Sequence, residues 1–107
     1  MIATEIRDAN WREIEGRMTG LRAKAYGHLL AFRDTGQTTR ELARNMGVSE
    51  LSARPRVTEL CQLGLAECVG RRGREGLYRG IPMAVARAAF EARRAGQAEQ
   101  RLLPLMV

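Results

Sequence analysis

The chain has 107 residues, enough for one small domain with an additional helix at either end. Hydrophobic residues make up 45% of it, so a core can form, but no apolar run approaches the 18 or so residues that a membrane span needs. The N-terminus also lacks the apolar stretch of a signal peptide. We therefore expect a cytoplasmic protein with no membrane partner, whose net charge of +6 favours nucleic acid by long-range attraction.

Residues for catalysis or metal binding are sparse. Cys61 and Cys68 have neither metal-ligand spacing nor a disulfide framework, so we expect ordinary buried or half-buried thiols. The single histidine, His28, lies beside the apolar stripe of a predicted helix, which favours a packing role. Neither cysteine has a partner acid or base. We therefore expect no catalytic residues, no metal, no cofactor and no enzymatic activity.

The N-terminal segment, residues 1–18, reads as a helical extension. Asn10 and Glu13 fit a capping box that would start a helix running to Met18. Trp11, Ile14 and Met18 fall on one face of that helix. This face is expected to anchor the segment on the domain body or, less often, to contact a second subunit.

Two helices of the central region have clear boundaries. The first runs from Leu21 to Arg33 and stops before Gly36. Thr38 and Glu41 then form a second capping box, which predicts a short helix ending at Gly47. Gly47 can adopt the positive φ that a sharp turn between helices requires.

The start of the third helix depends on Pro55, because either Ser49 or Ser52 can cap it. With Ser49 as the cap, Pro55 would lie inside the helix and remove a hydrogen bond to the Leu51 carbonyl, at a cost of roughly 3 kcal/mol. With Ser52 as the cap, Pro55 would lie in the first turn, where amides have no helical partner. We therefore favour Ser52 and expect a helix ending at Leu63 and Gly64.

A β-hairpin and a C-terminal helix complete the expected elements. Residues 65–69 and 77–80 read as strands, joined by a glycine-rich turn over residues 70–76 that contains three arginines. Residues 83–95 form an alanine-rich helix that we expect Gly96 to end; Val85, Ala88, Ala89 and Ala92 lie near one side of it. The apolar tail LLPLMV is expected either to pack back on the core or to meet another subunit.

This order of elements resembles the winged helix-turn-helix superfamily of DNA-binding proteins. Residues 20–81 carry the resemblance, through Glu41-Leu42-Ala43, Gly47-Val48-Ser49, Val57, Leu60, Gly64-Leu65 and the Arg-Gly tip. The segment SARPRVTELCQLGL also resembles MarR-like regulators and small winged-helix proteins of phages and mobile elements. The expected fold is mainly α with a small β-hairpin. It comprises an N-terminal helical extension (1–18), the winged domain (19–81) and a C-terminal helix with the apolar tail (82–107).

The resemblance implies sequence-specific binding of double-stranded DNA by a small transcriptional regulator. The helix of residues 52–63 would enter the major groove, and the wing tip of residues 70–76 would contact the backbone or the minor groove. The residues implied in DNA binding are Thr38, Thr39, Arg40, Ser49, Ser52, Arg54, Arg56, Thr58, Arg71, Arg72 and Arg74.

Two further expectations concern partners. The apolar flanks exceed what a minimal winged helix needs, so we expect a homodimer through the N- and C-terminal helices. The alternative function is a winged helix that acts through protein contacts, as an inhibitor or recruiter of a nucleic-acid enzyme. Acidic Glu50 and Glu75 lie close to the expected DNA surface, which leaves that alternative open.

Overall fold

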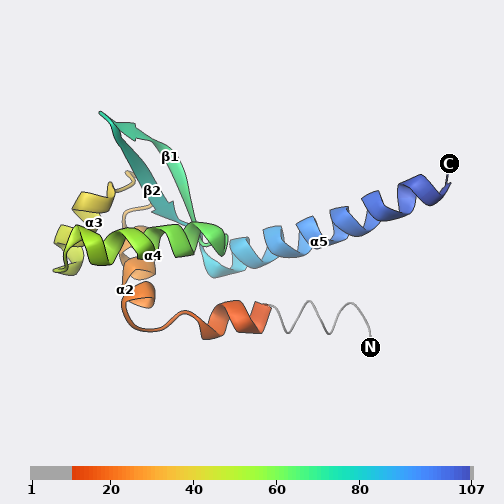
Figure 1. Cartoon of the computed structure of the whole chain (residues 1–107), viewed down its shortest axis with the longest axis horizontal. Helices are drawn as coiled ribbons and strands as arrows, with labels where there is room; N and C mark the ends of the chain where they lie inside the picture. The colour runs from red at the N-terminus through yellow and green to blue at the C-terminus, as the bar shows by residue number, and fades with distance from the viewer. Residues whose placement is uncertain (1–10, 107) are drawn as a thin grey trace.

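The fold is a small helical domain with one hairpin and a long projecting helix (Figure 1). The computed structural model describes the backbone of residues 11–106 and the side chains of residues 11–96. After a helical segment over residues 11–16 come α2 (Gly20–Ala31), α3 (Thr39–Met46), α4 (Glu50–Gln62), β1 (Ala66–Arg72), β2 (Glu75–Gly80) and α5 (Met83–Met106). The expected mainly helical class with one β-hairpin is confirmed. Asn10, half of the first expected capping box, lies outside the described residues.

The core forms where α2, α3 and α4 meet the base of the hairpin. Its largest fully buried apolar side chains are Leu29, Leu42, Leu60 and Leu65, one from each helix and one from the turn after α4. Aliphatic side chains fill most of this space, since few aromatic residues are present. Removing so much apolar surface from water is the main force that holds three short helices together.

The start of α3 follows the sequence prediction closely. The Thr38 hydroxyl accepts from the Glu41 amide at 3.1 Å, and the Thr38 amide donates to the Glu41 carboxylate at 3.0 Å. Both halves of the capping box are therefore present. Gly47 ends the helix with φ at +71°, the left-handed conformation expected of it.

The start of α4 corrects the sequence prediction. Ser49, not Ser52, is the cap: its hydroxyl accepts from the Ser52 amide at 3.2 Å, and Pro55 lies inside the helix. The proline removes the amide that would bond to the Leu51 carbonyl. Because Leu51 and Pro55 are both exposed, water can satisfy that carbonyl, and the earlier start costs less than a buried site would.

The hairpin is longer, and its turn tighter, than the sequence predicted. Arg72 pairs with Glu75, so only Gly73 and Arg74 form the turn instead of all of residues 70–76. Gly73 has φ at +65°, whereas Gly70 and Gly76 take part in the strand ladder. Glycine spacing alone cannot separate a strand glycine from a turn glycine, which explains the difference.

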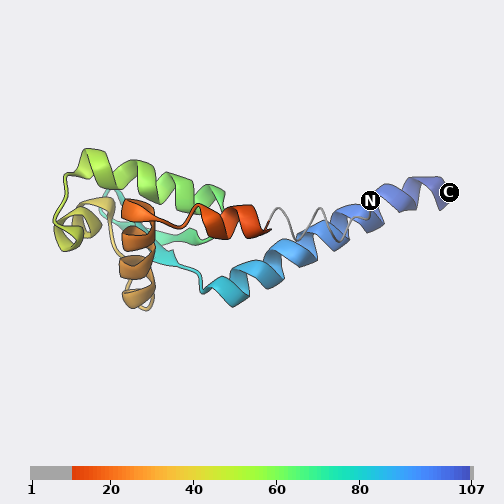
Figure 2. The ribbon, with the colours of Figure 1, turned by 90° about the horizontal axis from the view of Figure 1, so that it is seen from below.

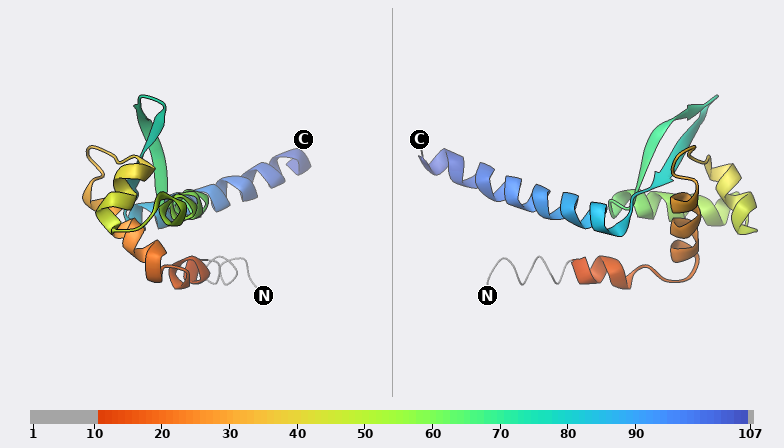
Figure 3. Two further views of the ribbon diagram at one scale, coloured as in Figure 1. Left: turned by 60° about the vertical axis from the view of Figure 1, so that its left-hand side comes forward. Right: turned by 180° about the vertical axis from the view of Figure 1, so that it is seen from behind.

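The base of the hairpin is fixed to the helices at two points. Gln37, in the loop before α3, exchanges both backbone hydrogen bonds with Tyr78 of β2, at 2.9 and 2.8 Å. Gly80 lies so close to α2 that a Cβ atom there would be 2.8 Å from the Leu30 nitrogen. These contacts set the direction in which the hairpin leaves the domain (Figure 3).

α5 also corrects the prediction, because it continues through Gly96 to Met106. A glycine inside a helix costs about 1 kcal/mol, which the alanine, glutamate, glutamine and leucine residues around it can offset. The helix projects away from the domain, so its C-terminal half does not fold back on the core (Figures 1 and 2).

Residues 11–18 pack on the first part of α5 and on the core. Trp11 is buried, and its ring centroid lies 5.6 Å from that of Phe90. Ile14 and Met18 also pack against the core. The expected anchoring role of this face is therefore confirmed. Most of the face is covered by other residues of the same chain.

Candidate nucleic-acid interface

Three elements converge at the end of the domain away from α5: the start of α3, the first half of α4 and the hairpin (Figure 1). We call residues 66–80 the wing. A pocket of about 120 Å³ marks the junction and is lined by Thr39, Glu50, Arg54, Glu75, Gly76 and Tyr78. Residues from all three elements therefore border one small hollow on a common surface.

α4 presents a continuous exposed surface, which we call the outer stripe: Leu51, Arg54, Pro55, Thr58 and Gln62. Its opposite face carries the buried residues Ala53, Val57 and Leu60. Since successive helical residues are turned by about 100°, this spacing places the two sets on opposite sides of the helix. α4 therefore rests on the core along one side and is open to a partner along the other.

The sequence-predicted residues of α4 divide between this stripe and the flank beside α2. Arg54 and Thr58 belong to the outer stripe, and the Thr58 hydroxyl donates to the Arg54 carbonyl at 3.3 Å. Arg56 is only 32% exposed and lies 2.6 Å from Glu59, which also pairs with Arg22 of α2. Ion pairing thus joins Arg56 to the α2–α4 contact, on a different side from Arg54.

The N-terminal turns of α3 and α4 hold the predicted hydroxyl residues. Thr38 is buried, with only 2% of its surface exposed, and its hydroxyl is engaged in the capping box. Thr39 is half-buried at the pocket edge. At the start of α4, the Ser49 hydroxyl donates to the Ser52 hydroxyl at 3.2 Å. Backbone amides at such helix starts suit phosphate oxygens.

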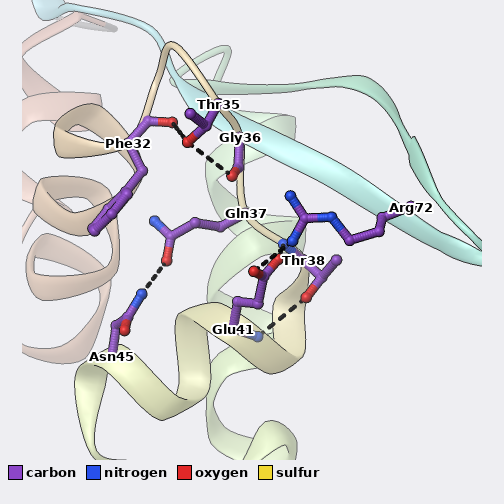
Figure 4. Close-up of polar contacts among 8 residues, drawn as sticks. All are labelled: Phe32, Thr35, Gly36, Gln37, Thr38, Glu41, Asn45 and Arg72. Carbon is purple, nitrogen blue, oxygen red and sulfur yellow. Dashed lines mark hydrogen bonds and ion pairs between the residues drawn. The ribbon is translucent and has the colours of Figure 1, made fainter.

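Carboxylates hold several of the predicted arginines in place. Arg40 lies 3.6 Å from Glu50 and 3.4 Å from Glu75, so one guanidinium links α3, α4 and the wing. Arg72 of the wing donates to Glu41 at 2.5 Å (Figure 4). Glu41, Glu50 and Glu75 therefore orient the basic side chains of this surface. Each such surface pair is worth only about 0–1 kcal/mol, so a polyanion can compete for the arginines.

The pKa of Glu41 reflects its position in this arrangement. The Thr38 backbone amide lowers the pKa most, and the hydrogen bond from Arg72 lowers it further. Partial desolvation opposes both effects without outweighing them. The carboxylate is therefore charged at neutral pH, which keeps the Arg72 contact in place there.

Other arginines of the surface are exposed and have no ion pair within residues 11–96: Arg44, Arg54, Arg71 and Arg74. Three of them were predicted from the sequence, whereas Arg44 in α3 was missed. Its only signal was a basic residue on a short amphipathic helix, which is common on solvated faces. Free guanidinium groups suit phosphates and guanine edges.

Gln37 is a second residue that the sequence did not single out. It is 3% exposed, its side-chain amide donates to the His28 carbonyl at 3.0 Å, and its Oε1 accepts from Asn45 at 2.7 Å (Figure 4). These bonds fix the loop that carries Thr38. No local pattern marks such a residue, because both partners come from other turns of the chain.

Among the described residues, no three His, Cys, Asp or Glu side chains gather closely enough to hold a metal ion. No described helix is long and apolar enough to cross a membrane.

Comparison with known proteins rests on structure. No protein-family model matches the chain, and no curated protein matches it significantly in sequence. MepR, a transcription regulator of the Staphylococcus aureus multidrug efflux pump MepA, has a TM-score of 0.58 and 18% identity, covering 98% of this chain and 78% of MepR. The MarR family transcription regulator SP03579 has a TM-score of 0.53 and 16% identity, covering 94% and 68%. PcaV from Streptomyces coelicolor, solved with its natural ligand, has a TM-score of 0.50 and 20% identity, covering 95% and 76%.

At such low identity the likeness shows the fold alone. The expected winged helix-turn-helix with additional N- and C-terminal helices is confirmed, and the resemblance to MarR-like proteins holds at that level. In winged helices, function depends on the particular surface that each chain presents.

Proposed function

We propose that this chain binds double-stranded DNA as a small transcription regulator. The observation that carries the proposal is Arg54, which lies exposed on the outer stripe of α4 and has no ion pair among the described residues. A helix that carries an exposed arginine without an ion pair suits the major groove. There the guanidinium group can bind guanine O6 and N7 in a bidentate manner. The structurally similar proteins MepR, SP03579 and PcaV are transcription regulators, which supports the same function for this chain.

In the proposed complex, contacts to bases and contacts to the backbone come from different elements. Arg54 and Thr58 face base edges, while the starts of α3 and α4 face phosphate through Thr39, Arg40, Ser49 and Ser52. Thr38 is buried and supports this surface by capping α3 instead of touching the phosphate. The wing arginines Arg71, Arg72 and Arg74 approach the backbone or the minor groove. Arg56 contributes less to the proposed DNA binding, because its guanidinium group already forms an ion pair with Glu59 beside α2.

We further propose that the chain acts as a homodimer in which α5 supplies much of the interface. Val85 is 57% exposed, and Ala88, Ala89 and Ala92 are exposed at helical spacing on the same side. A twofold dimer would place two copies of α4 on successive half-sites. Light scattering would then give twice the monomer mass, and Val85→Arg would shift the protein towards monomer.

The test of DNA binding is a random-library selection followed by fluorescence anisotropy over a salt series. Binding predicts that log K falls linearly with log salt, with a slope of about −0.9 per phosphate neutralised. Arg54→Ala should weaken binding to the selected site by about fivefold or more, the low end for one bidentate pair. Arg12→Ala makes the same charge change on the N-terminal segment and should have a small effect.

One observation favours the alternative, a winged helix that acts through protein contacts. Glu41, Glu50 and Glu75 offset the charge of Arg40 and Arg72 on the same surface. If no DNA is selected, or if binding does not depend on salt, the DNA proposal is wrong and the alternative is favoured.

A further inference from the structure

Leu51 is the most exposed large hydrophobic residue of the described chain. Its side chain is 82% exposed, against 57% for Val85, the next highest. It lies in the first turn of α4, because the helix begins at Glu50 and not at Ser52. A single exposed leucine is common on protein surfaces, so its exposure alone indicates no function. What matters for Leu51 is its place on α4, beside an arginine that has no ion pair among the described residues.

The position of Leu51 on α4 is central to the outer stripe. By helical rotation, it lies between Arg54 on one side and Pro55 on the other, and Thr58 follows two turns after Leu51 along the same stripe. It points directly away from the buried face formed by Ala53, Val57 and Leu60. A partner that contacts Arg54 along this stripe therefore also covers Leu51.

A second copy of this chain, joined through α5, would leave Leu51 uncovered. The first turn of α4 and α5 lie at opposite ends of the molecule (Figures 1 and 2). The described part of the N-terminal segment, residues 11–18, packs on α5 through Trp11 and Phe90 and not on Leu51. The occupant must therefore match an apolar group flanked by a free arginine.

We propose that Leu51 recognises the C5-methyl group of a thymine in the major groove, beside a guanine bound by Arg54. This inference rests on the proposed function and adds a specificity residue to it. The thymine methyl is the apolar group that base pairs present in the major groove, and apolar side chains contact it directly. The first turn of a recognition helix is where base edges are contacted.

Pro55 extends the same apolar contact. It is exposed, lies one turn after Leu51, and has no amide to be left unpaired against a methyl group. Residues four apart on a helix are about 6 Å apart, so the two side chains can cover one methyl group or two neighbouring ones. The proline that seemed unfavourable for a recognition helix thereby becomes part of an apolar reading surface.

The test removes the methyl group from the DNA. On the selected site, each thymine is replaced in turn by deoxyuridine, and anisotropy measures affinity for the wild type and for Leu51→Ala. The affinity of the wild type should fall about fourfold when one thymine next to a guanine is replaced, because burying one methyl group strengthens binding by about that factor. Leu51→Ala should bind the unmodified site more weakly and lose most of its sensitivity to that replacement, with Pro55 accounting for any remainder.

The controls separate this inference from the proposed function. Leu21→Ala removes a partly exposed leucine from α2 and should keep the wild-type sensitivity to deoxyuridine. Circular dichroism confirms that both variants fold. If the wild type binds DNA but tolerates deoxyuridine at every position, or if Leu51→Ala keeps the sensitivity, only the Leu51 role is wrong. If the wild type binds no DNA, the proposed function fails, and this role fails with it.

Discussion

The Arg72 guanidinium of the wing lies 2.5 Å from Glu41 Oε2, and Oε1 of the same carboxylate accepts the Thr38 amide that begins α3. One side chain therefore caps a helix and holds the tip of the hairpin near it. These two roles depend on different properties of the side chain. An uncharged oxygen can accept the amide hydrogen bond, but only a charged carboxylate can form an ion pair with arginine and neutralise it.

Glu41→Gln should raise DNA affinity and lower stability only slightly at neutral pH, because an exposed ion pair contributes little. Glutamine can complete the capping box, but it no longer neutralises Arg72, which becomes available to phosphate. The log–log salt slope should steepen by up to about one phosphate contact. Anisotropy over a salt series measures the change.

Thr38→Ala is the matched control, because it breaks the same capping box without removing a charge. It should cost about 1 kcal/mol of unfolding free energy and leave the salt slope unchanged. A fall in affinity for Glu41→Gln with unchanged stability would instead show that the Glu41–Arg72 pair is needed to position the wing.

Stability should fall in acid partly through Glu41. Its pKa is lowered in the folded protein by the Thr38 amide first and by Arg72 second. A group with a depressed folded pKa contributes stability above its unfolded pKa, near 4.3, and loses it as pH falls through the folded value. Urea unfolding from pH 7 to pH 3 should show a shallower loss for Glu41→Gln below about pH 4.5. Parallel curves for the two proteins would contradict this.

Two glycine substitutions should change stability in opposite directions. Gly27→Ala places a methyl in open space within α2 and should stabilise by about 0.5–1 kcal/mol, because alanine is the better helix former. Gly80→Ala would bring its Cβ to 2.8 Å from the Leu30 nitrogen. It should lower the free energy of unfolding by about 1–3 kcal/mol. Thermal unfolding measures both, and equal effects would mean that β2 can move away from α2.

The two cysteines should react with thiol reagents at different rates. Burial raises the pKa of Cys61 most, and the nearby Cys68 raises it further, so little thiolate forms at pH 8. Cys68 is exposed and should react first. Cys68→Ser should leave only the slow phase with a chromogenic disulfide reagent. A fast phase in that variant would show that α4 opens readily near its C-terminal end.

Local chemistry predicted much of the fold. The capping box at Thr38 and the left-handed Gly47 each depend on a few neighbouring residues, so both could be predicted from sequence. The starting point of α4 could not, because the cost of Pro55 depends on whether the Leu51 carbonyl is exposed. That exposure is settled only by packing α4 on the core.

The candidate site, too, could be predicted from the sequence only in part. Arg54, Arg71 and Arg74 are exposed as the pattern implied, whereas Arg56 is drawn to Glu59 and α2, and Arg72 to Glu41. Glu59 follows Arg56 by three residues on α4, so helical spacing could have indicated that pair. The Arg22–Glu59 and Arg72–Glu41 pairs join residues far apart in sequence, so no spacing rule reveals them.

The sequence by itself determined the order of helices and strands, because caps, glycines and apolar spacing act over a few residues. Tertiary structure alone decided which arginines are free, where Gln37 is buried and that Leu51 faces outward beside Arg54. Those features arise from contacts between distant segments, and their energies depend on burial and geometry that only the folded chain creates.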